Sequence, residues 1–183
     1  MKTHVAVVLV ESYSMSSIKN TLIPVFNDLT KAITDEPDTS LTFITFSTTV
    51  NVRFTGETGA RIPITAAQYQ PNGNTALLDA IGQAVGLLSN TPANPGDAYL
   101  VMVFTDGEEN ASRRFNPASM KKLIKEKQDE NNWTFAVQVP PGNAKNYATK
   151  YGIPEENVRE WEATVQGTQS AGWYADKGVK DYF

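Results

Sequence analysis

Hydroxyl side chains follow the first apolar run of the chain at a spacing of two. The run VAVVLV, residues 5–10, is followed by Ser12 and Ser14, and Thr75 and Asp106 stand in polar loops later in the chain. Oxygen ligands of these kinds suit a hard cation such as Mg²⁺, which takes octahedral geometry and keeps several waters. The four residues are therefore candidate ligands of a Mg²⁺ or Mn²⁺ ion.

Each candidate ligand also has an ordinary structural explanation. Thr75 is a good helix N-cap, Asp106 followed by Gly107 is a common turn, and the serines can satisfy backbone groups in their own loop. Their joint occurrence after suitable elements is what favours a site over these separate explanations.

Short apolar runs separated by helical patterns predict an α/β sheet. Continuous apolar runs at 5–10, 98–104 and 133–139 are typical of strands buried on both faces of a parallel sheet. Asn116 and Pro117 are suited to begin one of the intervening helices. Apolar residues at helical spacing predict the buried faces of three helices: Ile18, Leu22, Phe26, Leu29 and Ile33; Leu78, Ile81, Val85 and Leu88; Met120, Leu123 and Ile124.

The remaining elements complete an open sheet. Residues 41–46 and 50–55 predict a hairpin whose second strand is a half-exposed antiparallel edge. A weaker strand at 157–161 and a last helix from about Thr168 follow. The predicted fold class is α/β, a doubly wound, mostly parallel open sheet of about six strands with one antiparallel edge strand and helices on both faces. Ligands bind such sheets beyond the C-terminal ends of the strands, where the strand order reverses.

Two glycines stand four residues apart in the second predicted helix. Gly82 and Gly86 each cost roughly 1 kcal/mol of helix stability relative to alanine. We expect that the absence of side chains at these two positions lets this helix lie close on the sheet.

Three segments of the chain resemble, in order, the signature segments of the von Willebrand factor type A (vWA) domain, which has a Rossmann-like fold. They are VVLVESYSMSS, NGNTALLDAIG and VMVFTDGEENAS. The metal-ion-dependent adhesion site (MIDAS) of that family has the pattern D-x-S-x-S, then T, then D. The segment GIPEENVREWEATVQGTQSA, residues 152–171, is similar to the tail of small stand-alone A-domain proteins of bacteria and their phages. The resemblance implies a single vWA-like domain over residues 1–183, and it matches these residues to the metal site: Ser12, Ser14, Thr75 and Asp106.

The first aspartate of the family pattern is missing. Its position falls on Val10, and the glycine usual between the serines falls on Tyr13. Glu11 is one residue late, and neighbouring side chains of an extended chain point to opposite faces. With one carboxylate left, we expect this degenerate MIDAS to bind Mg²⁺ or Mn²⁺ weakly or not at all. Three acids are candidate substitutes: Glu11, Glu108 and Glu109.

The resemblance implies a non-enzymatic module that binds a protein partner through the loops at the C-terminal edge of the sheet. A carboxylate of the partner could complete the coordination of an ion. An aromatic ring on a loop face is a suitable contact anchor, although the ring of Tyr13 could instead pack on the neighbouring loop. The candidate contact residues are Tyr13, Asn74 and Asn110.

Two other functions stay open. The first is a structural or assembly subunit of a phage particle or a bacterial complex, which could self-assemble. A metal motif that has lost its first aspartate agrees with this function equally well. A metal-dependent hydrolase or phosphatase would act through Asp106. Val10 stands where an aspartyl nucleophile is expected, however, and the only histidine, His4, precedes the first strand at the opposite end of the sheet.

Composition argues against several classes of function. The net charge is -4 and no Lys/Arg cluster is present, which disfavours nucleic-acid binding. The chain has no cysteine, so disulfides and thiolate ligands are excluded. No segment approaches the ~20 apolar residues that span a bilayer, and no signal-peptide pattern is present. We expect a cytoplasmic protein, or a virion-associated one if a phage encodes it.

Overall fold

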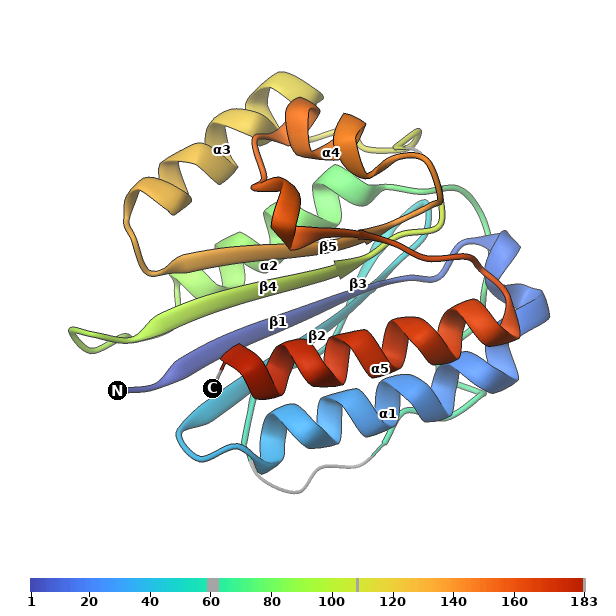
Figure 1. The fold of residues 1–183 in the computed structure, drawn as a ribbon, viewed down its shortest axis with the longest axis horizontal. Helices are drawn as coiled ribbons and strands as arrows, with labels where there is room; N and C mark the ends of the chain where they lie inside the picture. Colours follow the sequence, from blue (N-terminus) through green and yellow to red (C-terminus); the bar gives the residue numbers. More distant parts are fainter. Residues whose placement is uncertain (59–62, 108, 183) are drawn as a thin grey trace.

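A six-stranded sheet in the order β3-β2-β1-β4-β5-β6 organises the molecule (Figure 1). The computed structural model describes residues 1–58, 63–107 and 109–182. Neighbouring strands run parallel except β2 and β3, which form the antiparallel edge pair. The predicted fold class is therefore confirmed. The strands are β1 (Thr3–Val10), β2 (Thr39–Phe46), β3 (Val50–Glu57), β4 (Ala98–Phe104), β5 (Trp133–Val139) and β6 (Val158–Glu160).

Helices cover both faces of the sheet. On one face, α1 (Lys19–Asp35) and α5 (Val165–Tyr182) lie side by side (Figure 1). The other face carries α2 (Leu77–Ser89), α3 (Pro117–Asp129) and α4 (Ala144–Tyr151). Two short 3-10 helices, η1 (Tyr13–Ile18) and η2 (Glu155–Asn157), complete the elements. In the described part of the chain, no helix combines the length and the apolar character needed to cross a membrane.

The apolar faces predicted for the helices form much of the core. Leu22, Phe26, Leu29 and Ile33 of α1 are buried, as are the predicted residues of α2. Phe26 packs edge-on against Phe104 of β4, with ring centroids 4.6 Å apart. The side chain of Asn116 accepts a hydrogen bond from the Ser119 N–H, and this capping box fixes the start of α3 as predicted. The last helix begins at Val165, three residues before the predicted start.

The expectation for the two glycines of α2 is only partly met. A Cβ on Gly82 would lie 2.1 Å from Cε2 of Phe115, which belongs to the loop before α3 and not to the sheet. A Cβ on Gly86 would meet nothing within 4 Å. Gly82 is thus required by close packing against an aromatic ring, whereas Gly86 is required by no contact.

The order of the strands places the ends of β1 and β4 side by side. From β1 the chain proceeds outward to β2 and β3, and it then returns to build β4, β5 and β6 on the other side of β1. The strand order therefore reverses between the parallel strands β1 and β4, which is where ligands bind in folds of this kind. The loops that follow these two strands carry Ser12, Ser14 and Asp106.

Candidate functional site

The loops after β1 and β4 bring two serines onto one aspartate. Ser12 Oγ lies 3.1 Å from Asp106 Oδ1 and donates to it, and Ser14 Oγ donates to Asp106 Oδ2. The two serine oxygens lie 3.0 Å apart. Ser12 is buried and Ser14 is exposed, so the cluster lies at the surface with one open side. These contacts join segments more than 90 residues apart, as the predicted strand order requires.

Thr75 adjoins this cluster but does not cap the helix that follows it. The helix α2 begins at Leu77 with Ala76 at its N-cap, and no side chain at that position accepts a hydrogen bond. Thr75 is buried, and its backbone oxygen accepts hydrogen bonds from the N–H groups of Asn110 (3.1 Å) and Ala111 (3.2 Å). Its Oγ1 lies 4.0 Å from the position that a Cβ on Gly107 would take. Thr75 therefore lies against the loop that carries Asp106.

The Glu109 carboxylate caps α2, and its oxygens are engaged in hydrogen bonds there. Its Oε2 accepts hydrogen bonds from Leu78 N (2.9 Å) and Ser112 Oγ (2.7 Å). Its Oε1 accepts from Ala111 N (3.0 Å) and Ser112 N (2.5 Å). Both oxygens of this candidate substitute acid are thus engaged by the helix start and its own loop. The other candidate in this loop, Glu108, lies outside the described residues.

Glu11 faces the edge of the sheet and not the serine cluster. Its carboxylate is buried and accepts hydrogen bonds from Arg53 Nη2 at 3.0 and 2.7 Å. Gln70 N donates to the same carboxylate at 2.5 Å. Glu11 therefore joins β1, the edge strand β3 and the loop before Thr75, and it contributes no oxygen to the Ser12–Asp106 cluster.

Val10, which takes the place of the first aspartate, is a core residue. Its exposed fraction is 0%, and its backbone oxygen accepts a hydrogen bond from the Tyr69 hydroxyl at 2.6 Å. Burial raises the pKa of Tyr69 well above its usual value, and the negative charges of Glu11 and Asp106 raise it further. The tyrosine therefore stays protonated and holds the end of β1 as a hydrogen-bond donor.

Aromatic donors from the end of the chain hold the Asp106 loop in place. Trp161 Nε1 donates to the backbone oxygen of Thr105, and the Tyr147 hydroxyl donates to that of Gly107, each at 2.8 Å. Both contacts fix the backbone on either side of Asp106. We did not predict these two residues, because neither stands in a recognisable pattern with the aspartate.

The contact candidates differ in how they are placed. Tyr13 is 74% exposed, so its ring does not pack on the neighbouring loop, and its N–H donates to Gly73 O at 3.3 Å. Asn74 and Asn110 are also exposed. The side-chain oxygen of Asn110 accepts a hydrogen bond from Thr75 N at 2.9 Å and so has a structural role.

The donors gathered at the cluster would offer a divalent cation one formal negative charge. They comprise the Asp106 carboxylate and the hydroxyls of Ser12, Ser14 and Thr75. Mg²⁺ is normally held by one or two carboxylates together with substrate phosphates and waters. Across the residues that the structure describes, no group of three or more His, Cys, Asp or Glu side chains could hold a metal ion. The chemistry that the cluster offers most readily is hydrogen bonding.

A serine, a histidine and an aspartate do meet at the opposite end of the sheet. His4 Nδ1 lies 2.8 Å from Ser40 Oγ, and His4 Nε2 lies 3.3 Å from Asp97 Oδ2. The three residues are 5% exposed or less, so a substrate cannot reach the serine. Asp97 also accepts the backbone N–H groups of Lys2 and Asn94, which lowers its pKa. This arrangement ties the start of β1 to the sheet and does not resemble an accessible hydrolase site.

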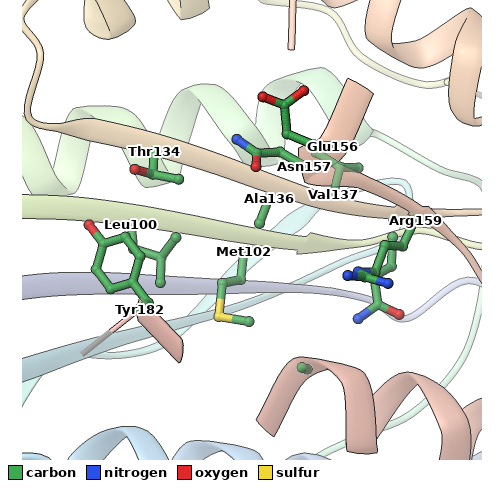
Figure 2. Close-up of a pocket in the computed structure, with 11 residues that line it drawn as sticks. Leu100, Met102, Thr134, Ala136, Val137, Glu156, Asn157, Arg159 and Tyr182 are labelled. Carbon is green, nitrogen blue, oxygen red and sulfur yellow. The ribbon is translucent and has the colours of Figure 1, made fainter. Parts of the chain in front are cut away.

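A pocket of about 220 Å³ lies away from the serine cluster, between the sheet and α5. Figure 2 shows Met102 and Ala136 at its floor, with Glu156 and Asn157 on one side and Tyr182 on another. Asp106 does not line it, so the pocket gives no support to a hydrolase that acts through this aspartate.

The family model of the von Willebrand factor type A domain matches residues 5–161. No curated protein matches the chain. Similar solved structures include proximal thread matrix protein 1 from the mussel byssus with a zinc-occupied MIDAS motif, with a TM-score of 0.68, 15% identity, and coverage of 97% of this chain and 46% of that chain. The chain thus spans less than half the length of that mussel protein.

Two further solved structures have the same fold, with similar TM-scores and sequence identities. The manganese-loaded TRAP protein of Plasmodium vivax has a TM-score of 0.65 and 16% identity, with 97% of this chain and 73% of that chain covered. The SpRpn10 VWA domain has a TM-score of 0.63 and 12% identity, with 93% of each chain covered. At these identities the similarity shows the fold alone.

Proposed function

Because the chain belongs to the von Willebrand factor type A family, we propose that it is a non-enzymatic module that binds a protein partner through the loops at the C-terminal edge of its sheet. Domains of this family typically mediate protein-protein interactions. The binding face comprises the loops that carry Tyr13, Asn74 and Asn110 around the Ser12–Asp106 cluster.

The exposure of Tyr13 is the observation that carries this proposal. At 74% exposed, it is the most exposed of the aromatic side chains whose exposure the structure describes, and it lies between two residues of the serine cluster. Tyrosine is enriched among the residues that dominate binding energy at protein interfaces. An unpacked ring in the middle of a loop that is otherwise held by hydrogen bonds is well placed to enter a pocket on a partner.

The metal-binding part of the family function is weak or lost in this proposal. Val10 is buried where a second carboxylate would stand, and Asp106 accepts hydrogen bonds from both serines. Without a metal ion, the exposed Ser14 oxygen, whose proton is donated to Asp106, can still accept a hydrogen bond from a donor group of the partner. Partner binding should therefore persist when divalent cations are removed.

The proposal also treats residues 1–183 as one vWA domain. The last helix lies beyond the residues that match the family model, and it packs closely on α1. A Cβ on Gly172 of α5 would lie 2.3 Å from Val25 Cγ1 of α1. This close contact supports α5 as part of the same folding unit.

Affinity capture from a lysate of the source cells tests the binding face. We expect a protein captured by the wild type to be lost with Tyr13→Ala and kept with Val52→Ala, which truncates another exposed apolar side chain on the edge strand. Capture should be the same with chelator and with Mg²⁺. Equal capture by Tyr13→Ala would contradict the proposal. Stable self-assembly in size-exclusion chromatography, with no captured partner, would favour a structural subunit instead.

A further inference from the structure

Contacts with the first half of α2 hold residues 109–115, here called the arginine segment, in a fixed position. Asp79 Oδ2 accepts a hydrogen bond from Arg113 N at 2.8 Å, and its Oδ1 accepts from Arg114 N and Phe115 N at 3.0 Å each. The ring of Phe115 fills the space left by the missing side chain of Gly82. The segment is thus anchored at its end by three hydrogen bonds and an aromatic contact.

The two arginines of this segment carry positive charges that pair with no acid among the described residues. Arg113 and Arg114 are exposed, and within residues 1–58, 63–107 and 109–182 neither forms an ion pair. The acids that adjoin them, Asp79 and Glu109, use their oxygens on backbone N–H groups and the Ser112 hydroxyl. Arg53, by contrast, is paired with Glu11. In a chain with a net charge of -4, these two exposed guanidinium groups, unpaired within the described residues, are available to a partner.

Hydrogen bonds connect the arginine segment to the proposed binding face. Tyr13 N donates to Gly73 O, and the N–H groups of Asn110 and Ala111 donate to Thr75 O. Asp79 N then donates to Ser112 Oγ at 3.0 Å, one residue before Arg113. The loop after β1, the loop that carries Thr75 and the arginine segment are therefore neighbours, and the Thr75 loop contacts both of the others.

We propose that Arg113 and Arg114 bind carboxylate groups of an acidic protein partner that docks on the face containing Tyr13. The guanidinium group presents a planar fork of donors that matches a carboxylate in bidentate geometry. Tyrosine and arginine are also the residue types enriched at the centres of interfaces. In this arrangement the arginines supply the positive charge that a metal ion would otherwise offer to an acidic partner. This inference rests on the proposed function.

The charge of the chain favours an acidic protein over a nucleic acid. Binding to a phosphate backbone takes most of its strength from several basic residues that act together. Here the basic surface is a pair of arginines on an acidic protein. A small cluster of carboxylates on a protein surface is the partner that matches two guanidinium forks.

A titration of the ¹⁵N-labelled protein with hexaglutamate, followed by NMR, tests the inference. We expect amide shifts in the arginine segment, and binding that weakens as the salt concentration rises and is unaffected by chelator. The Arg113→Gln/Arg114→Gln variant should bind about tenfold more weakly. The charge-matched control is Lys122→Gln/Lys125→Gln, whose lysines lie on α3 in exposed pairs with Glu126 and Asp129, and it should bind like the wild type.

Equal binding by the arginine variant and the wild type would overturn the inference, as would tighter binding of a single-stranded oligonucleotide than of hexaglutamate. The arginine variant keeps the hydrogen bonds of this segment, because the backbone and not the guanidinium groups makes them. The control loses only exposed ion pairs on α3. The titration and the capture experiment can also contradict the two proposals independently. A partner lost with Tyr13→Ala but kept by the arginine variant overturns this inference alone. Hexaglutamate binding at Arg113 with no partner captured overturns the proposed function alone.

Discussion

Glu11 and Arg53 form an ion pair beneath the candidate site, with Arg53 Nη2 2.7 Å from Glu11 Oε2. Arg53 reaches the acid from a β-bulge: Val52 pairs with Ile44 and Phe54 pairs with Phe43, so Arg53 is the extra residue of β3. A bulge of this kind re-aims one side chain of a strand. The acid nearest the missing aspartate is therefore used to hold the edge strand and the loop at Gln70, and not to bind a metal ion.

Glu11→Gln should lower the free energy of unfolding by about 2 kcal/mol, because it leaves the partly buried Arg53 without its counter-charge. The exposed fractions of the two side chains are 3% for Glu11 and 24% for Arg53. The control is Asp35→Asn, which breaks an exposed pair with Lys31 and should cost less than about 0.5 kcal/mol. Urea unfolding measures both. Equal losses would show that the Glu11 pair is no stronger than a surface pair.

The convergence of Ser12, Ser14 and Asp106 was predictable from the sequence because strand order depends on few choices. Residues 5–10 and 98–104 are apolar throughout, since both faces of a central parallel strand are covered by helices. Once β1 and β4 are adjacent, the residues after them must meet. Pairing of β1 with β4 residue by residue, from Thr3 with Ala98 to Leu9 with Phe104, confirms this part of the prediction.

The interactions that support the site were not predictable, because they depend on side-chain directions set by irregular backbone. The bulge that directs Arg53 toward Glu11 has no glycine or other marker in the sequence. Thr75 has the type of an N-cap, yet Glu109, from a segment more than 30 residues later, bonds to the first turn of α2. Likewise, nothing in the pattern of α2 indicates that Gly82 accommodates Phe115 and that Gly86 accommodates no side chain.

Val10→Asp/Tyr13→Gly should create a Mg²⁺ site if the loop is a disabled MIDAS. Val10 is fully buried, so without metal the new carboxylate should destabilise the protein by a few kcal/mol. Mg²⁺ should recover much of that loss, because a ligand that binds only the folded state raises its stability. Thermal melting with Mg²⁺ and with chelator measures the difference, and the wild type should show at most a small shift.

The control for the created site adds Asp106→Ala to the two changes. In this triple variant the second carboxylate is gone, and the Mg²⁺-dependent rise in melting temperature should vanish. A double variant that gains nothing from Mg²⁺ would show that the three loops do not form a metal-competent arrangement. A clear Mg²⁺ effect in the wild type that is lost with Asp106→Ala would show that one carboxylate is sufficient.

Asp97→Asn should lower the melting temperature at neutral pH and have less effect in acid. Backbone N–H groups of Asn94 and Lys2 hold the pKa of Asp97 below its usual value, so its charged form stabilises the folded state. That contribution is complete above the ordinary value of about 3.9 and is lost as the pH falls through the lowered pKa. The difference between the melting temperatures of variant and wild type should therefore begin to shrink as the pH falls below about 4, and it should vanish below the lowered pKa of Asp97. Asp28→Asn, exposed on α1, is the control and should follow the wild type at every pH. If the difference in melting temperature between Asp97→Asn and the wild type does not change with pH, the loss of stability comes from altered geometry and not from the lost charge.

Gly82→Ala and Gly86→Ala should change stability in opposite directions, although both replace a glycine within α2. Alanine at 86 meets nothing within 4 Å and should stabilise the helix by about 1 kcal/mol. Alanine at 82 would place its Cβ 2.1 Å from Phe115 Cε2, so the ring must move, which costs about 1–3 kcal/mol and outweighs the gain in helix propensity.

A double-mutant cycle identifies the ring as the cause of the loss at 82. In a Phe115→Ala background, Gly82→Ala should stabilise the helix as Gly86→Ala does, because nothing then occupies the space. Gly82→Ala should also broaden or shift the amide signals of Arg113 and Arg114, whose backbone is fixed beside Phe115 by Asp79. If Gly82→Ala stabilises the protein in the presence of Phe115, the ring does not anchor the arginine segment, whose position then depends on the hydrogen bonds to Asp79.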